Sequence, residues 1–388
     1  MIPYGRQSIN ESDIEAVIAV LRSDFLTQGP AVPAFERAVA EYCGVPYAVA
    51  CNSATSALHL ACLALGLGPG DLLWTSPNTF VASANCARYC GADVDFVDIE
   101  PDTANLSPQA LADKLARAAR DGRLPRIVVP VHFAGHSCDM RAIRELADRY
   151  GFAVIEDASH AIGGRYDGGP VGDCRYSDIT IFSFHPVKIV TTGEGGMATT
   201  RNSELARRMA RLRTHGITRE PQEMTAQPEG GWYYEQIELG FNYRMTDIQA
   251  ALGRSQLARI DTLIASRRAR VQRYHERLAG LPLVLPVEKP GTASAWHLYT
   301  VRLADTLTGG GRRAVYDALR RAGIGVNVHY IPVHLQPYYR RLGFGPGDFP
   351  VAEDHYARAL TLPLFPDLSE TDQEAVITAM HRALERPS

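Results

Sequence analysis

Between residues 46 and 200, short continuous runs of apolar residues alternate with stretches in which apolar positions recur every three or four residues. Continuous apolar runs are typical of strands buried on both faces, and the longer spacing is typical of amphipathic helices. The runs are found at 46–51, 71–76, 126–133, 152–157 and 178–184, and the helical stretches at 55–66, 79–91, 108–122 and 140–151. This alternation predicts an α/β fold with a mainly parallel sheet covered by helices on both faces.

The pattern changes after about residue 202, where long amphipathic helices are predicted at 203–216 and 245–280. The rest of the chain combines a helix at 312–323, a strand-like segment at 324–333 and a closing helix at 371–385. We therefore expect a large domain over residues 1–250, whose N-terminal segment packs on a smaller C-terminal α+β domain over residues 251–388. The Gly- and Pro-rich stretch at 220–232 is predicted to be a long loop that serves as a lid or a contact arm.

Composition and charge narrow the class of protein. The 388 residues include 40 basic and 43 acidic ones, for a net charge of −3, and no basic cluster that would indicate a nucleic-acid partner. The start of the chain has no leader pattern and no uncharged apolar stretch reaches membrane-spanning length, so we expect a cytoplasmic protein without a membrane partner.

Seven scattered cysteines without a CxxC pair predict reduced core thiols and no metal site. His132 and His136 flank a turn after a strand, which argues against a metal site there as well.

Lysine is used sparingly in this chain, because only Lys114, Lys188 and Lys289 among the 40 basic residues are lysines. A desolvated lysine amine can lose its proton and attack a carbonyl, whereas arginine stays charged. The helical spacing predicts that Lys114 faces solvent, and the Pro- and Gly-rich surroundings of Lys289 predict an exposed loop. Lys188 lies among apolar and small residues, where it serves either chemistry or a structural ion pair.

Several polar residues follow predicted strands, where the binding residues of a parallel sheet gather. If the cofactor is pyridoxal phosphate (PLP), Lys188 supplies an amine for its aldehyde and Asp157 a carboxylate for its ring nitrogen. Ser53, Ala54 and Thr55 open a helix and offer an anion site, and Phe80 offers a ring face. Each of these residues has an ordinary alternative as a helix cap or a core residue, but their order along the chain favours the cofactor.

The chain resembles the DegT/StrS family of sugar aminotransferases over nearly its full length. The resemblance is carried by seven ordered segments: LTQGP at 26–30, NSATSAL at 52–58, SPNTFVAS at 76–83, EDASHAIG at 156–163, SFHPVKIVTTGEGG at 183–196, GFNYRMTDIQAAL at 240–252 and HYIPVHLQPYY at 329–339. It implies a fold type I PLP enzyme whose large domain holds a mainly parallel mixed sheet, and it implies a homodimer with shared active sites.

The same resemblance implies roles for individual residues. Lys188 matches the Schiff-base lysine, Asp157 the partner of the pyridinium nitrogen, and Phe80 the ring-stacking residue. Ser183, Thr55 and the Ala54 amide match phosphate contacts, His160 matches a position beside the cofactor, and Asn242 matches an asparagine that reaches the neighbouring subunit's phosphate. The resemblance also places four residues near the nucleotide sugar: Thr27 and Gln28 in LTQGP, His329 and Tyr330. The alternative is that they only pack against neighbouring residues and have a structural role.

Two details refine the expected substrate. His185 and Ile189, on either side of the lysine, resemble one branch of the family that makes pseudaminic acid precursors. That branch transfers an amino group from L-glutamate to C4 of a UDP-linked 2-acetamido-2,6-dideoxy-hexos-4-ulose. The alternatives are an aminotransferase for another UDP- or dTDP-linked 3- or 4-keto-6-deoxy sugar, a sugar dehydratase, a fold type I lyase or desulfurase, and a non-catalytic regulator that binds PLP or a sugar. Lys188 weakens the dehydratase reading, since the resemblance implies histidine there in such enzymes.

Overall fold

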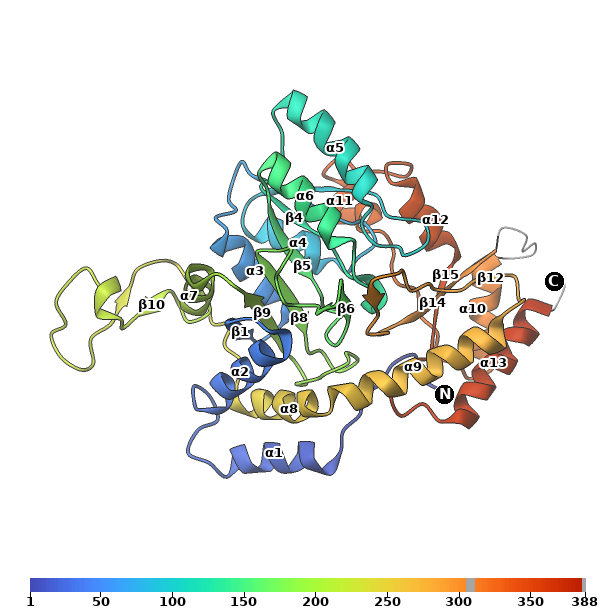
Figure 1. Cartoon of the computed structure of the whole chain (residues 1–388), viewed down its shortest axis with the longest axis horizontal. Coiled ribbons are helices and arrows are strands. Elements are labelled where there is room, and N and C mark those ends of the chain that lie inside the picture. Colours follow the sequence, from blue (N-terminus) through green and yellow to red (C-terminus); the bar gives the residue numbers. More distant parts are fainter. Residues whose placement is uncertain (305–310, 386–388) are drawn as a thin grey trace.

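The computed structural model describes residues 1–304 and 311–385. A seven-stranded mixed sheet forms the centre of the larger part of the molecule (Figure 1), in the order β1-β9-β8-β5-β4-β2-β3. Its strands are β1 (Tyr47–Cys51), β2 (Leu72–Thr75), β3 (Asp93–Phe96), β4 (Ile127–Val129), β5 (Ala153–Asp157), β8 (Ile179–Ser183) and β9 (Gly196–Thr200). Only β9 runs against its neighbours, so the predicted α/β architecture with a mainly parallel sheet is confirmed.

Helices cover both faces of this sheet. Along β4, Ile127 and Val129 belong to one core with the helices α3 and α4, while Val128 between them belongs to another core with α5 and α6. This double burial explains why the strands read as continuous apolar runs. The helices around the sheet are α2 (Ala31–Cys43), α3 (Ala54–Ala64), α4 (Ala82–Tyr89), α5 (Pro108–Asp121), α6 (Met140–Tyr150) and α7 (Ser203–Leu212), with the 3-10 turn η1 (Phe133–Gly135).

Local sequence signals set the ends of these helices. Helix α5 begins after Ser107, whose side chain accepts a hydrogen bond from the Ala110 amide, and it has proline at its first position. It ends at Gly122, whose φ of 66° lies in the left-handed region that glycine adopts without strain. Both ends agree with the helix predicted at 108–122.

The smaller part of the molecule has a core of its own, built on a three-stranded antiparallel sheet in the order β12-β14-β15. Its strands are β12 (Leu283–Val284), β14 (Tyr299–Leu303) and β15 (Ala359–Leu362), and its helices are α10 (Gly311–Arg321) and α13 (Glu370–Glu385). The turn η3 (Val333–Leu335) and the helices α11 (Pro337–Arg340) and α12 (Pro350–Arg358) instead place buried residues in a core of the large sheet. A further small sheet joins β6 (Arg165–Tyr166) and β7 (Gly169–Pro170) to β13 (Thr292–Ala293).

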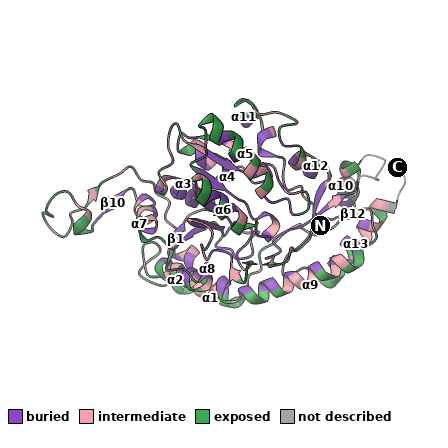
Figure 2. Cartoon of the chain, turned by 45° about the horizontal axis from the view of Figure 1, so that its top comes forward, coloured by how far each residue is buried: buried purple, intermediate pink, exposed green. Residues whose placement is uncertain are grey.

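Two consecutive helices connect the parts of the molecule. Helix α8 (Asp247–Ala258) packs against α2 and against α1 (Glu11–Leu21), and α9 (Ile260–Leu278) continues diagonally toward α13 (Figure 1). The outer faces of α1 and α9 are largely exposed (Figure 2). The domain division at residue 250 stays a prediction.

The prediction of a strand at 324–333 is wrong. This segment forms only isolated pairs, of Ile324 with Ile2 and of Asn327 with Thr361. The N-terminal chain approaches it so closely that a Cβ atom on Gly325 would lie 2.7 Å from the Ile2 carbonyl oxygen. Contacts with a remote segment therefore replace the hydrogen-bond ladder expected of a strand.

The stretch at 220–232 lies in an arm that projects from the body of the molecule (Figures 1 and 2). The strands β10 (Ile217–Thr218) and β11 (Glu235–Gln236) pair antiparallel and close it, and the short turn η2 (Pro221–Glu223) lies between them. Two large apolar side chains of the arm and its base, Trp232 and Leu239, are 73% and 81% exposed. Across the described residues, no helix is both long enough and apolar enough to cross a membrane.

Candidate active site

A cavity of about 670 Å³ lies beyond the carboxyl ends of the parallel strands β1, β5 and β8. Binding sites in open α/β sheets form at this edge. Residues predicted from the sequence line it: Ser53, Ala54, Thr55, Phe80, Asp157, His160, Ser183, Lys188, His329 and Tyr330. The structure therefore brings together side chains that are almost 280 residues apart in the sequence.

Lys188 faces this cavity with an amine that loses its proton easily. Burial lowers the pKa of Lys188 to about 8, and the nearby carboxylate of Asp157 opposes that shift. The amine makes no hydrogen bond or ion pair with any side chain among residues 1–304 and 311–385. The alternative explanation, that Lys188 is buried to form a structural ion pair, is therefore not supported, because its amine has no such partner in the described chain.

Three histidines surround the amine and are held neutral. Burial, with the charge of Lys188 as the next cause, lowers the pKa of His160 and His297 well below the ordinary value and that of His329 to about 3. Asp157 is therefore the principal counter-charge of Lys188 in the cavity. His297 was not predicted from the sequence, and neither was Tyr4, which lines the cavity from the N-terminal segment.

The hydrogen bonds of His160 fix its tautomer. Its Nδ1 atom accepts a hydrogen bond from the Ala134 amide at 3.2 Å, so the proton of the neutral ring lies on Nε2. Nε2 is 3.2 Å from the hydroxyl of Tyr330 and donates to it. The hydroxyl proton of Tyr330 is then free to be donated to a ligand in the cavity.

The start of α3 forms part of the cavity wall. Ser53 caps this helix by accepting a hydrogen bond from the Ser56 amide at 3.1 Å, and the amides of Ala54 and Thr55 belong to the first turn, which has no acceptor within the helix. Strand β9 approaches closely here, because a Cβ atom on Gly196 would lie 2.5 Å from the Ala54 nitrogen. A helix start with free amides is a site for an anion such as phosphate.

Three predicted site residues lie elsewhere in the single chain. Thr27 pairs with Thr246 and Asn242 pairs with Thr214. Gln28 lines a separate cavity of about 210 Å³. In one chain these residues do not line the cavity of Lys188.

The cavity fits PLP on geometric grounds. The amides at the start of α3 suit the phosphate, the carboxylate of Asp157 suits the ring nitrogen, and the amine of Lys188 suits the aldehyde. The ring of Phe80 is 60% exposed and lies at the mouth of the cavity, where it can cover a ring face of the cofactor. No cluster of potential metal ligands occurs in the part of the chain that the structure describes.

His132 and His136 have structural partners. His132 Nε2 lies 2.7 Å from a carboxylate oxygen of Glu156, and His136 contacts the amide of Lys289 at 3.0 Å. Lys289 is half-buried and pairs with Asp102 at 2.9 Å, so it is not a freely exposed loop cation. All seven cysteines are free and buried, which confirms that they are reduced core residues.

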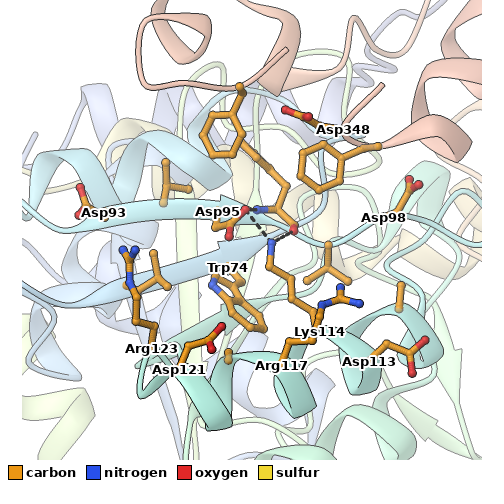
Figure 3. Close-up of a pocket in the computed structure, with 18 of the residues that line it drawn as sticks. Trp74, Asp93, Asp95, Asp98, Asp113, Lys114, Arg117, Asp121, Arg123 and Asp348 are labelled. Carbon is orange, nitrogen blue, oxygen red and sulfur yellow. Dashed lines mark hydrogen bonds and ion pairs between the residues drawn. The ribbon is translucent and has the colours of Figure 1, made fainter. Parts of the chain in front are cut away.

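A second cavity, of about 870 Å³, lies at the β3 edge of the sheet (Figure 3) and corrects the prediction for Lys114. The Lys114 amine is 2.7 Å from a carboxylate oxygen of Asp95, donates to the Phe96 carbonyl and lies 4.9 Å from the centre of the Trp74 ring. Its side chain is only 20% exposed, so the expectation of a solvated helix residue is wrong. Lys114 instead donates a hydrogen bond to a carbonyl of the edge strand β3, which among the described residues has no further strand beside it to accept from.

The fold and the cavity define a PLP-dependent aminotransferase. The chain belongs to the DegT/DnrJ/EryC1/StrS aminotransferase family, which it matches over residues 7–381. Spore coat polysaccharide biosynthesis protein SpsC of Bacillus subtilis is 40% identical over 98% of this chain and 96% of its own length.

Solved structures agree with this assignment. Helicobacter pylori PseC, described as an aminotransferase of pseudoaminic acid biosynthesis, superimposes with a TM-score of 0.90 at 29% identity over 99% of both chains. Spr1654 of Streptococcus pneumoniae, in its PMP-form, has a TM-score of 0.90 at 30% identity over 99% of both chains. The same protein is also known in a PLP-form. The cofactor of the family, and of this chain, is pyridoxal phosphate.

Proposed function

We propose that this aminotransferase moves an amino group from L-glutamate to C4 of a UDP-linked 2-acetamido-2,6-dideoxy-hexos-4-ulose, as in pseudaminic acid biosynthesis. The observation that carries the chemistry is the shared cavity of Lys188 and Asp157, in which burial brings the pKa of the amine to about 8. The similarity to PseC over the full chain supports the sugar, as do His185 and Ile189 beside the lysine.

Each residue of the cavity has a task in this proposal. PLP, when bound, supplies an electron sink for the carbon whose proton is removed. Lys188 binds the aldehyde and, when free, carries the proton away from the donor Cα, which a partly neutral amine can do near pH 7. Asp157 holds the proton on the ring nitrogen. His160, kept neutral, orients Tyr330 so that its hydroxyl donates into the cavity.

The phosphate and the ring of the cofactor are bound by the walls of the cavity. The amides of Ala54 and Thr55 and the hydroxyls of Ser53 and Ser183 would hold the phosphate, and Phe80 would cover a ring face. His329 is buried and lines the cavity with Tyr330, where we expect both side chains to contact the sugar. Its ring is fixed by a 2.8 Å hydrogen bond between Nδ1 and the hydroxyl of Thr361.

We infer further that the protein acts as a homodimer with shared sites. Thr27, Gln28 and Asn242 lie outside the cavity of their own chain, so they can serve a cavity only across an interface. Large exposed apolar side chains on the arm and beside α1 support an association of copies: Phe25, Leu26, Trp232 and Leu239.

Complementation tests the shared site. Lys188→Ala and Asn242→Ala are each expected to be inactive alone, and an unfolded and refolded mixture is expected to regain activity, because a mixed dimer contains one intact site. A mixture that stays inactive while forming mixed dimers contradicts shared sites.

A second candidate substrate is another UDP- or dTDP-linked 3- or 4-keto-6-deoxy sugar, which the 40% identity to SpsC favours. The experiment that decides is incubation of the PLP-loaded protein with L-glutamate and a panel of such keto sugars, with product stereochemistry determined by NMR. We expect amination at C4 of the UDP-linked N-acetylated 4-keto sugar. Amination only of a dTDP-linked or 3-keto sugar contradicts the first proposal and supports the second, while no turnover of any sugar contradicts both.

A further inference from the structure

A chain of buried hydroxyls ends on the carboxylate of Asp157. Ser83, on the first turn of α4, is 0% exposed, and its hydroxyl donates to Oδ2 of Asp157 at 2.6 Å. The hydroxyl of Thr79, which is 2% exposed, lies 2.7 Å from the hydroxyl of Ser83. Neither residue was predicted as a site residue.

The direction of these hydrogen bonds follows from counting protons. A hydroxyl has one proton to donate. Since Ser83 gives its proton to Asp157, Thr79 must be the donor to Ser83. The Phe80 carbonyl, at 3.4 Å from the Ser83 hydroxyl, is a much longer alternative acceptor. The hydroxyls therefore form a one-way chain that terminates on a carboxylate oxygen.

The other oxygen of Asp157 is held from a different direction. Oδ1 accepts a hydrogen bond from the Ser159 amide at 3.1 Å. With one donor on each oxygen, the carboxylate cannot turn about its Cβ–Cγ bond without losing a hydrogen bond in a buried place, where a lost bond is costly. Each carboxylate oxygen has two lone pairs, so Oδ2 can accept from Ser83 and still accept from the N–H of a cofactor ring.

We propose that Ser83, supported by Thr79, is a positioning residue that orients the Asp157 carboxylate toward the cofactor ring nitrogen. The inference rests on the proposed role of Asp157. The same segment carries Phe80, three residues before Ser83 and just ahead of α4, so this segment can both cover the ring and align its charged partner. The two tasks are performed by the loop and first turn that follow β2.

The test compares PLP binding to matched variants by absorbance titration. Ser83→Ala removes the donor, and we expect the PLP dissociation constant to rise about tenfold, as for loss of a hydrogen bond to a charged group, with a shift of the visible band of the bound cofactor. Ser83→Thr keeps the hydroxyl and is expected to restore affinity and spectrum to within about twofold.

The control is Thr75→Val, which removes a hydroxyl of equal burial that donates to the Val129 carbonyl at 2.8 Å and not to Asp157. Its PLP affinity and spectrum are expected to equal those of the parent. Melting of the cofactor-free proteins separates a folding defect from a positioning defect. If Ser83→Ala does not fold, Thr79→Val replaces it, with an expected rise of about threefold in the dissociation constant because Ser83 loses its own donor.

Parental PLP affinity and spectrum in Ser83→Ala, or in Thr79→Val where that variant stands in, overturn the inference. So does a Ser83→Thr variant that folds but binds as weakly as Ser83→Ala. These outcomes differ from a failure of the proposed function, in which the parent protein itself does not bind PLP or does not aminate a keto sugar.

Discussion

The pKa of Lys188 gives the sharpest quantitative prediction for the cofactor-free protein. An amine with a pKa of about 8 is roughly 10% neutral at pH 7, against about 0.03% for an amine at the ordinary value, so burial raises the reactive fraction about 300-fold. Asp157 is the charge that opposes this shift. The substitution Asp157→Asn removes the negative charge that stabilises the ammonium form of Lys188, so the pKa of Lys188 must fall below its parental value.

The pKa can be measured by acylating the protein with a trace of reagent over a range of pH and following the rate at each lysine by mass spectrometry. Only the neutral amine reacts, so the rate at Lys188 follows its deprotonation. The chain has three lysines, so the rate at Lys188 is easily separated from the rates at Lys114 and Lys289. We expect an inflection near pH 8 in the parent and a lower one in Asp157→Asn. Glu194→Gln is the matched control, since Glu194 also lines the cavity but does not shift Lys188.

Two results would refute this reasoning. The first is a rate at Lys188 that inflects near the ordinary lysine value of 10.5. The second is an inflection that stays constant or rises in Asp157→Asn while Glu194→Gln behaves like the parent.

Four further substitutions test other parts of the structure. Phe80→Ala should weaken PLP binding about fivefold with little change in melting temperature, because the ring is 60% exposed. His132→Ala should lower the free energy of unfolding by about 2 kcal/mol in urea titrations, since it removes one hydrogen bond to buried Glu156, which keeps those from Ser177 and Thr180. Burial raises the pKa of Glu156, but hydrogen bonds led by that from His132 lower it overall, so this difference should shrink as the pH falls below about 4. Lys114→Ala should cost about 1–2 kcal/mol in the same titration without changing the cofactor spectrum. Gly196→Ala should abolish PLP binding, because β9 must then move away from the start of α3.

The sequence pattern predicted those site residues that come directly after a strand. Asp157 and Ser183 end apolar runs, and Ser53 opens the helix after another run, so the geometry of a parallel sheet alone brings them to one edge. The structure confirms that they line one cavity with Lys188. Ser83 and His297 were missed because their partners in the cavity are remote in sequence, and no local spacing records such contacts.

The wrong predictions have a related cause. Helical spacing wrongly assigned Lys114 of α5 to solvent, because the short strand β3, with its alternating Asp residues, was not recognised as the sheet edge against which that side chain lies. The segment at 324–333 has an alternating pattern, but the N-terminal chain at Ile2 occupies its backbone groups. In both places the outcome depends on a neighbour that the local pattern does not contain.

Covalent trapping of the cofactor tests the central claim most directly. PLP-loaded protein is reduced with borohydride, digested and analysed by mass spectrometry. The account predicts a pyridoxyl phosphate adduct on Lys188 alone, with none on Lys114 or Lys289 and none in Lys188→Ala. An adduct on another lysine, or a bound cofactor that reduction leaves unattached, would contradict it.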